Sequence, residues 1–529
     1  MPADMDLRCE CGVGGIYLKK GFNPRELPDL NRMMLVALQH RGQLSAGFTI
    51  YDPEYSGRLK IRKEIGRVGD LFKIHVKERN RGIVRNSEGV ASLNHVRYAT
   101  SGADERSYEE LMEEALPLLR DHPNPWKKFS IVYNGTLANQ DALLKEIKQR
   151  YLFHPEVDTA VIRESISRGL NQLSNPSGEK PDFFNVSRGV MERLDGGYAV
   201  GLLFADGDMA VWRDPLGIRP MVYGENKDYF AFASESSVLR KIGISRDEIF
   251  SVEPGSCLLY NGEGLQAKQL FPENSKRALC HFELVYFAKA RSIIDGISVN
   301  SVRENLGGYL ADNEPLLDKI REAPDDWIVV PVPRTSIPAT EEYAFKRGIR
   351  FKEAIEVDEV LRGFINRAKD REMIMGDKYD AIEERVRGKH VIVIDDSLVR
   401  GSTSRKIVRM IRGAGALSLH MRSTEPPITS PCFYGIDTPT YDELLAANFA
   451  IKRGVDLNEV SKRFEKDAAF KRDLEAYVAE AIGADSMGYP TVSGLVKAIG
   501  WREEDLCLAC VTNNYPTVAG QKNASLLLA

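Results

Sequence analysis

The stretch Val391-Ile-Val-Ile-Asp395-Asp396-Ser397-Leu-Val-Arg400-Gly401-Ser402-Thr403-Ser404 decides the fold of the second half of the chain. Its apolar start predicts a buried strand, two carboxylates follow at the carboxyl end of that strand, and a Gly-Ser-Thr loop leads into an amphipathic helix. A helix N-terminus behind such a loop offers free backbone N–H groups to a phosphate. Two carboxylates beside a phosphate would repel it unless they bind hydroxyl groups or a divalent metal. The alternative is a solvated Asp-Asp turn before an ordinary helix cap, which is less favoured because all four parts occur in the right order.

Apolar runs followed by helical patterns recur in the second half, at residues 327–332 and 390–394. Such runs are typical of parallel strands buried on both faces, and their alternation with helices predicts a doubly wound α/β domain. The first half, to about Leu270, shows short strand patterns separated by turns, with helices expected at 27–38 and 156–173. This order predicts an α+β sandwich of sheets and helices. The strands expected in the first half are 11–17, 90–93, 130–133, 198–204 and 229–233.

The length of 529 residues favours two domains of about 200 to 270 residues each. A polar stretch at 272–277 predicts the boundary, with domains at 11–272 and 273–455 and a charged helical segment at 456–529 that ends in a tail without strong periodicity. The formal charge of −4 shows no general attraction to nucleic acid or to anionic membranes. No apolar run is long enough for a bilayer, and the first ten residues lack the apolar core of a secretory signal. We therefore expect a cytoplasmic protein without nucleic-acid or membrane partners.

The Asp395–Ser404 stretch resembles the phosphoribosyl-pyrophosphate loop of type I phosphoribosyltransferases. The resemblance implies that Asp395 and Asp396 bind the ribose hydroxyls and Mg²⁺. The segment Val330-Pro-Val-Pro-Arg334-Thr335-Ser336 looks like the pyrophosphate-side loop of that family, which places Thr335 and Ser336 beside the Mg²⁺ ion. The residues implied to hold the 5′-phosphate are Ser397, Arg400, Gly401, Ser402, Thr403 and Ser404.

A second set of motifs begins with Cys11-Gly-Val-Gly-Gly-Ile. Alone, this motif is weak, and a buried structural cysteine would explain it. It gains weight from four companions, which are Gln39-His-Arg-Gly-Gln43, His95-Val-Arg97-Tyr98, Tyr133-Asn134-Gly135 and Asp158-Thr159. Together they resemble the class II, N-terminal-nucleophile glutamine amidotransferases, whose fold is an αββα sandwich.

The amidotransferase resemblance implies a mechanism for the first domain. An N-terminal cysteine can use its own α-amine, which titrates near pH 8, as the base that activates the thiol. Cys11 is internal as translated, so residues 1–10 would be a propeptide that is removed. Asn134 and the amide of Gly135 would form the oxyanion hole. Arg97 and Asp158 would grip the α-carboxylate and α-amine of glutamine.

Both sets of motifs, in this order on one chain, resemble the amidophosphoribosyltransferases from Cys11 to about Thr517. The implied reaction hydrolyses glutamine through a thioester and passes ammonia internally to phosphoribosyl pyrophosphate. The products are 5-phosphoribosylamine, glutamate and pyrophosphate, in the first step of de novo purine synthesis. The resemblance also implies purine nucleotides as inhibitors and a homo-oligomer, either a tetramer or a dimer. Arg362, in a loop that runs to Arg371, would close over the substrate.

Seven cysteines are an odd number at low density, which argues against a disulfide framework. Taken alone, Cys507-Leu-Ala-Cys510 suits zinc, an iron–sulfur cluster or a redox dithiol about equally. One branch of the family carries a [4Fe–4S] cluster, and the resemblance assigns its ligands to Cys280, Cys432, Cys507 and Cys510. Cys257 matches no ligand position and is expected in the core.

One segment departs from the family pattern. Members usually have Lys-Asn-Arg-Tyr-Val-Gly-Arg-Thr-Phe before the mobile loop, whereas this chain has Glu356-Val-Asp-Glu-Val-Leu-Arg-Gly-Phe364. A negative charge within about 6 Å of a bound anion is unfavourable by roughly one to several kcal/mol. Arg334 stands where an acidic residue is common, which would compensate in part. Two alternatives therefore stay open: a diverged paralogue with another phosphorylated acceptor, and a non-catalytic regulator that binds phosphoribosyl pyrophosphate or nucleotide.

Overall fold

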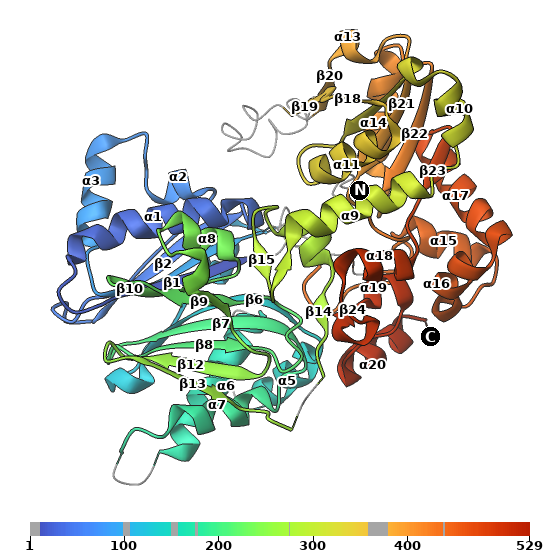
Figure 1. Ribbon diagram of the computed structural model, residues 1–529. Coiled ribbons are helices and arrows are strands. Elements are labelled where there is room, and N and C mark those ends of the chain that lie inside the picture. The colour runs from blue at the N-terminus through green and yellow to red at the C-terminus, as the bar shows by residue number, and fades with distance from the viewer. Residues whose placement is uncertain are drawn as a thin grey trace.

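The computed structural model describes residues 11–98, 106–149, 157–174, 178–273, 276–357, 379–436, 438 and 440–528 (Figure 1). No helix within these ranges is long and apolar enough to cross a membrane.

The first half of the chain forms two antiparallel sheets that stack face to face. The seven-stranded sheet has the order β11-β9-β10-β1-β4-β2-β3, and the six-stranded sheet has the order β13-β12-β8-β7-β6-β5. The first comprises β1 (Gly12–Leu18), β2 (Ser45–Tyr51), β3 (Leu59–Ile65), β4 (Ala91–Arg97), β9 (Val222–Glu225), β10 (Tyr229–Ala233) and β11 (Ile249–Ser251). The second comprises β5 (Leu118–Arg120), β6 (Phe129–Leu137), β7 (Gly196–Phe204), β8 (Met209–Arg213), β12 (Ser256–Tyr260) and β13 (Leu265–Gln269).

Helices cover the outer faces of both sheets. Apolar residues between the sheets, such as Val13 and Leu93 against Val132 and Leu203, form the central core. Helices α1 (Leu27–Leu38) and α8 (Ser236–Lys241) pack on the first sheet. Helices α5 (Gln140–Lys148), α6 (Asp158–Leu173) and α7 (Phe183–Met191) pack on the second. The predicted αββα sandwich is therefore confirmed (Figure 1).

The second half is built on a five-stranded parallel sheet of order β18-β17-β21-β22-β23. Alternate residues of each central strand face opposite layers. Ile328 and Val391 pack with α14 (Ser402–Gly413) and α17 (Ala468–Ile482), whereas Val329 and Ile392 pack with α9 (Val299–Asp312) and α11 (Ile337–Arg347). Helices thus lie on both faces, which confirms the doubly wound α/β fold. The strands are β17 (Trp327–Pro331), β18 (Arg350–Phe351), β21 (His390–Asp395), β22 (Ser418–Ser423) and β23 (Ser486–Gly488).

The C-terminal segment is more closely integrated than its sequence pattern suggests. β23 completes the parallel sheet beside β22, and β24 (Leu506–Cys507) pairs in parallel with β14 (Leu279–Cys280). The tail expected to lack periodicity forms α20 (Val518–Leu528). This helix returns to the sandwich, where the Ala519 amide donates to Asp195 Oδ2 over 3.0 Å. In Figure 1, β14 and β24 lie side by side where the two halves of the molecule meet.

A buried ion pair fastens the parallel sheet to its helical layer. Arg422 of β22 donates to both carboxylate oxygens of Glu314 over 2.6 and 2.8 Å, and Glu314 also accepts from Tyr343 of α11 over 2.6 Å. The Arg422 and Glu314 side chains are 2% and 0% exposed. Such a pair adds little net stability over an apolar substitute, but breaking it leaves an uncompensated buried charge.

We expect Glu314→Ala to lower the free energy of unfolding of the parallel-sheet region by about 3 to 5 kcal/mol, because Arg422 stays buried without its carboxylate. The measurement is the shift of the chemical-denaturation transition. The control Asp473→Ala removes the partner of Arg453 from an ion pair whose two side chains are each 52% exposed, and its effect should stay below about 1 kcal/mol. Transitions that shift equally in the two variants would contradict the prediction.

Candidate active sites and cysteine site

Cys11 lies directly before β1, the strand at the centre of the seven-stranded sheet. Burial raises the pKa of its thiol, while a backbone hydrogen bond at Tyr98 and the positive charges of Arg97 and Arg41 act in the opposite direction. The Cys11 carbonyl accepts from Arg41 Nε over 3.4 Å. A buried thiol of raised pKa needs a base to become a nucleophile. Residues 1–10, the expected propeptide, lie outside the described ranges.

Asn134 and Gly135 lie on β6, which faces β1 across the sandwich core. The Asn134 side chain is buried, and neither its Oδ1 nor its Nδ2 has a hydrogen-bond partner among the described residues. A buried amide without a partner costs free energy, so a ligand at this position would satisfy it. Gly135 has φ +144°, and an added Cβ would lie 2.0 Å from the Gly197 carbonyl oxygen of the neighbouring strand, so β6 requires glycine at this position.

Asp158 is the first residue of α6 and is buried next to β6. Its Oδ2 accepts from the Leu137 amide over 3.1 Å and from the Tyr133 hydroxyl over 3.4 Å, whereas no described residue donates to its Oδ1. Burial raises the pKa of Asp158 to about 7, although these two hydrogen bonds act to lower it. After burial, the charges of Asp158 and Cys11 both raise the pKa of Tyr133, so the thiol and this carboxyl group both lie near the Tyr133 hydroxyl.

Arg97, at the end of β4, has a partner that the sequence analysis missed. Its Nη2 donates to Glu114 Oε2 over 2.7 Å, while Nη1 has no partner among the described residues. Glu114 ends helix α4 (Tyr108–Glu114). No pattern in the sequence marks it, because its role depends on tertiary contact with β4. The ion pair with Glu114 fixes the Arg97 guanidinium and leaves its Nη1 group available to donate to a carboxylate.

If Asp158 binds the α-amine of glutamine as predicted, its raised pKa would make that binding depend on pH. Below a pKa of about 7 the carboxyl is neutral and no longer attracts an ammonium group. We expect the affinity of the mature Cys11→Ala variant for glutamine to fall about tenfold for each pH unit below 7, and to level off above it. Calorimetric titration from pH 5 to 9 measures this affinity. The variant that also carries Asp158→Asn should bind weakly at every pH, and an unchanged pH profile in that variant would contradict the assignment.

The predicted phosphate loop forms at the carboxyl edge of the parallel sheet. β21 ends at Asp395, and Gly401, with φ +73°, precedes the first turn of α14. An added Cβ at Gly401 would lie 2.7 Å from Leu445 Cδ1, so a side chain fits neither the conformation nor the space. Ser402 and Thr403 are partly exposed at the helix N-terminus, while Ser404 is buried. Arg400 pairs with Glu443, a residue that sequence reasoning did not include.

The Asp396 carboxylate is held in place by hydroxyl groups, whereas the Asp395 carboxylate accepts from the Asp396 amide over 2.9 Å. Asp396 accepts from the Thr335 hydroxyl and, over 3.1 Å, from Ser397 Oγ. Burial raises the pKa of Asp396 to about 6, although these hydroxyls and the charge of Arg303 lower it. The Ser336 hydroxyl instead donates to the Val332 carbonyl over 2.7 Å. The structure therefore brings Thr335 to the aspartates and turns the Ser336 hydroxyl toward its own loop.

The departure from the family pattern is described only at its start. Glu356 lies in β19 (Ile355–Val357), which pairs with β20 (Tyr379–Ala381). Residues 358–364, including Arg362, lie outside the described ranges. The role expected of Arg362 therefore stays a prediction.

Known proteins match both halves of the chain. A profile described as a glutamine amidotransferase domain matches residues 107–241. The amidophosphoribosyltransferase of Bacillus subtilis strain 168 is 33% identical over 520 residues, which cover 96% of this chain and 94% of the relative. The amidophosphoribosyltransferase of Pyrococcus horikoshii is 34% identical over 509 residues, which cover 96% of this chain and 96% of the relative.

The chain belongs to the amidophosphoribosyltransferase family.

A solved structure supports this assignment over the whole length. Glutamine phosphoribosylpyrophosphate amidotransferase from B. subtilis, complexed with ADP and GMP, superposes with a TM-score of 0.76 at 31% identity. The match covers 98% of this chain and 100% of the B. subtilis chain. The order of the amidotransferase sandwich and the parallel-sheet transferase region is thus the order found in the family.

The four cysteines that the family resemblance singled out come together from three segments. Cys280 and Cys507 are register partners in the β14–β24 pair, and Cys510 lies in α19 (Ala509–Thr512). The amides of Thr429 and Ser430, just before Cys432, donate to the Cys510 carbonyl over 2.9 and 3.0 Å. Burial raises the pKa of Cys507 and Cys510 well above the usual value, and the other thiols of the set raise both further.

The four cysteines offer a donor set that metal centres use. Zn–S bonds of about 2.3 Å place tetrahedral sulfur ligands within about 4 Å of one another. Among the described residues, the group whose ligand atoms all lie within 4.8 Å is His281, Glu425 and Cys510, which contains one of the four thiols. The four thiols as placed are therefore not all within the reach of one zinc ion, and Cys₄ ligation is typical of [4Fe–4S] centres. Cys257 is buried in β12, as predicted.

Proposed function

We propose that this chain catalyses the transfer of ammonia from glutamine to phosphoribosyl pyrophosphate, the activity for which its family is named. The observation that carries the proposal is the full-length match to amidophosphoribosyltransferases, because one chain holds both a glutaminase fold and a phosphate loop. Glutamine, water and phosphoribosyl pyrophosphate would give glutamate, 5-phosphoribosylamine and pyrophosphate. This is the first step of purine synthesis.

In the glutaminase half, Cys11 would be the nucleophile once residues 1–10 are removed. Its new α-amine would take the thiol proton, and the sulfur would attack the side-chain amide carbon of glutamine. Asn134 supports this role because its buried amide has no described partner, so its N–H can donate to the oxyanion without breaking an existing bond. Arg97 and Asp158 would hold the two ends of the glutamine backbone, each through an atom without a described partner. Water then releases glutamate from the thioester.

In the transferase half, Asp395 and Asp396 would bind the ribose hydroxyls and Mg²⁺, with Thr335 beside them. Carboxylate oxygens are the ligands that Mg²⁺ prefers, and the hydroxyl bonds to Asp396 keep its carboxylate in one orientation. When bound, Mg²⁺ would neutralise charge on the leaving pyrophosphate. The N-terminus of α14, from Gly401 to Ser404, would bind the 5′-phosphate through backbone N–H groups.

Two further features belong to the same proposal. Cys280, Cys432, Cys507 and Cys510 would hold a [4Fe–4S] cluster of structural role, supported by their convergence and by the electrostatic effect of Cys280 and Cys432 on the pKa of both Cys507 and Cys510. Purine nucleotides would inhibit the enzyme, since the similar B. subtilis enzyme was solved with ADP and GMP. We also propose that the mature protein is a homo-oligomer in the cytoplasm.

A paired assay tests the proposed reaction. Anaerobically purified protein is incubated with glutamine, with and without phosphoribosyl pyrophosphate and Mg²⁺, while glutamate and pyrophosphate are both measured. Equal amounts of the two products are expected. Glutamate without pyrophosphate would mean that the glutaminase serves another acceptor, and tight binding of phosphoribosyl pyrophosphate without turnover would identify a regulator.

A further inference from the structure

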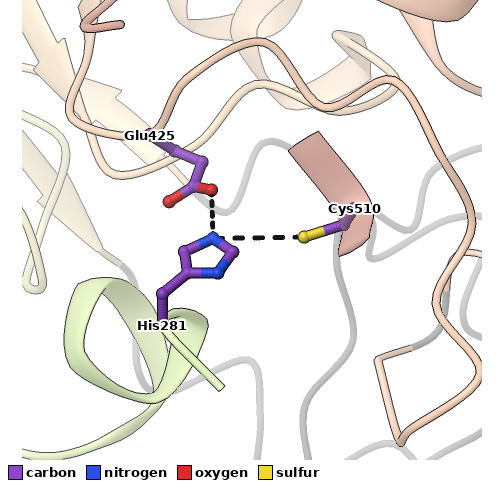
Figure 2. A group of neighbouring side chains, drawn as sticks. All are labelled: His281, Glu425 and Cys510. Carbon is purple, nitrogen blue, oxygen red and sulfur yellow. Dashed lines mark hydrogen bonds and ion pairs between the residues drawn. The ribbon is translucent and has the colours of Figure 1, made fainter. Parts of the chain in front are cut away.

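Three buried side chains meet beside the cysteine site: His281, Glu425 and Cys510 (Figure 2). His281 Nε2 lies 2.5 Å from Glu425 Oε1 and 4.0 Å from Cys510 Sγ. The other ring nitrogen, Nδ1, lies 2.7 Å from the Cys507 carbonyl oxygen. The His281 and Glu425 side chains are both 0% exposed. The histidine therefore contacts two of the proposed cluster ligands and a buried carboxylate at once.

All three side chains are of types that bind metals, but their spacing does not suit a shared ion. Ligand atoms about 2.1 Å from one ion, at angles of 90° or more, stand about 3 Å or more apart. The 2.5 Å between His281 Nε2 and Glu425 Oε1 is shorter and is the length of a strong hydrogen bond. The geometry is that of a histidine–carboxylate pair that shares a proton.

The hydrogen bonds fix the arrangement of the ring. A carbonyl oxygen only accepts, so Nδ1 carries a hydrogen that it donates to Cys507. Nε2 then faces Glu425 and Cys510 with the proton shared between nitrogen and oxygen. Without His281, the Glu425 carboxyl group would be buried next to the Cys510 sulfur without its hydrogen-bond partner.

Glu425 is held from the transferase side. Its amide donates to the Asp396 carbonyl over 2.9 Å, and its carbonyl accepts from Ser423 Oγ over 2.8 Å. The residue therefore continues from β22 toward the cysteine site while its backbone stays attached to the proposed Mg²⁺-binding loop. His281 follows Cys280 directly and is fixed by β14.

We propose that His281 and Glu425 are a positioning pair for the cysteine cluster, in which the contacts of His281 hold Cys507 and Cys510 in ligating positions and Glu425 holds His281. The proposal rests on the cluster proposed above. Groups that hydrogen-bond metal ligands orient those ligands, and their loss costs roughly 10- to 100-fold in metal affinity. The pair thus extends the cluster site beyond its four cysteines.

The test measures iron release to a chelator from anaerobic protein, followed by the loss of visible cluster absorbance. We expect Glu425→Gln, which keeps the side-chain shape, to release iron about tenfold faster than the unmodified protein, and His281→Ala to release it up to about 100-fold faster. The double variant His281→Ala, Glu425→Ala should release iron more slowly than His281→Ala alone, because it no longer buries a carboxyl group without a hydrogen-bond partner. If the two side chains only filled space, the double variant would release iron faster than His281→Ala, since its cavity is larger.

The matched control is His390→Ala, which removes a histidine at the start of β21 and should leave the release rate within about twofold. Single variants that release iron at the unmodified rate would overturn the pair, as would a double variant that is worse than His281→Ala. A bound zinc ion that is lost in His281→Ala would show a metal site instead. Protein that holds no iron after anaerobic reconstitution would overturn the cluster itself. If His281→Ala does not fold, the rate of iron release from Glu425→Gln tests the proposal on its own.

Discussion

Replacing Cys11 with serine is expected to lower glutamine-dependent formation of 5-phosphoribosylamine by roughly 1000-fold or more, while formation from added ammonium salt stays within about twofold. The Cys11 thiolate is proposed to attack glutamine, and a serine hydroxyl at this position would be a far weaker nucleophile. The transferase site needs ammonia but not its source, and Cys11 lies in the sandwich rather than at the parallel sheet. Pyrophosphate release with each nitrogen donor measures both reactions.

The control for this variant is Cys257→Ser. Cys257 is a buried cysteine of β12, and its Sγ accepts a hydrogen bond from Ser187 Oγ over 3.6 Å. Its glutamine-dependent rate should stay within about threefold of the unmodified protein, because a sulfur-to-oxygen change in the core affects stability rather than chemistry. A Cys11→Ser protein that still used glutamine at a tenth of the normal rate would rule out Cys11 as the nucleophile. Equal loss with both nitrogen donors would point to misfolding.

The second large effect is expected from Asn134→Ala, with a fall of roughly 100- to 1000-fold in kcat for glutamine hydrolysis and little change in KM. The lost donor would act on the oxyanion, which exists only after the carbonyl is attacked, so ground-state binding is spared. Since the Asn134 amide has no described partner, its removal breaks no existing hydrogen bond. Steady-state glutaminase kinetics separate kcat from KM.

Asn139→Ala is the matched control for Asn134→Ala. Asn139 lies just beyond β6, where it donates to the Arg193 carbonyl over 2.9 Å and accepts from the Asp195 amide over 3.1 Å. Its loss should lower stability by about 1 kcal/mol and leave kcat within about twofold. A rise in KM without a fall in kcat for Asn134→Ala would assign Asn134 to substrate binding and not to the oxyanion.

Local sequence patterns predicted the elements whose signal lies within the element itself. Helix α1 spans the expected 27–38, β10 spans the expected 229–233, and β21 extends one residue beyond the expected 390–394. In each of them the apolar period matches the burial that the fold imposes. Strand β23 gave no such signal, because Ser486–Gly488 is short and is a strand only through its pairing with β22.

The same distinction between local and long-range signals applies to the functional sites. Asp395, Asp396 and the loop to Ser404 could be derived from residues close together in the chain, whereas the roles of Cys11, Asn134 and the cysteine set depended on resemblance. Glu114, Glu314 and the His281–Glu425 pair were missed. Each acts on a partner in another element, 17 residues away for Glu114, 108 for Glu314 and 144 for the His281–Glu425 pair, and no local period predicts such a contact.

The pairing of β14 with β24 also constrains the order in which the protein can be assembled. His281 and Cys507 are 226 residues apart, so the ribosome must synthesise nearly the whole chain before either strand can find its partner. The sandwich can fold while the rest of the chain is still being synthesised, but β14 then lacks its partner strand β24, and the backbone groups that pair with β24 stay unpaired. Iron delivered before the last residues emerge would meet one or two thiols rather than four. Insertion of the proposed cluster would therefore be a late step of biogenesis, and a chain that ends before Cys507 would be expected to hold no iron.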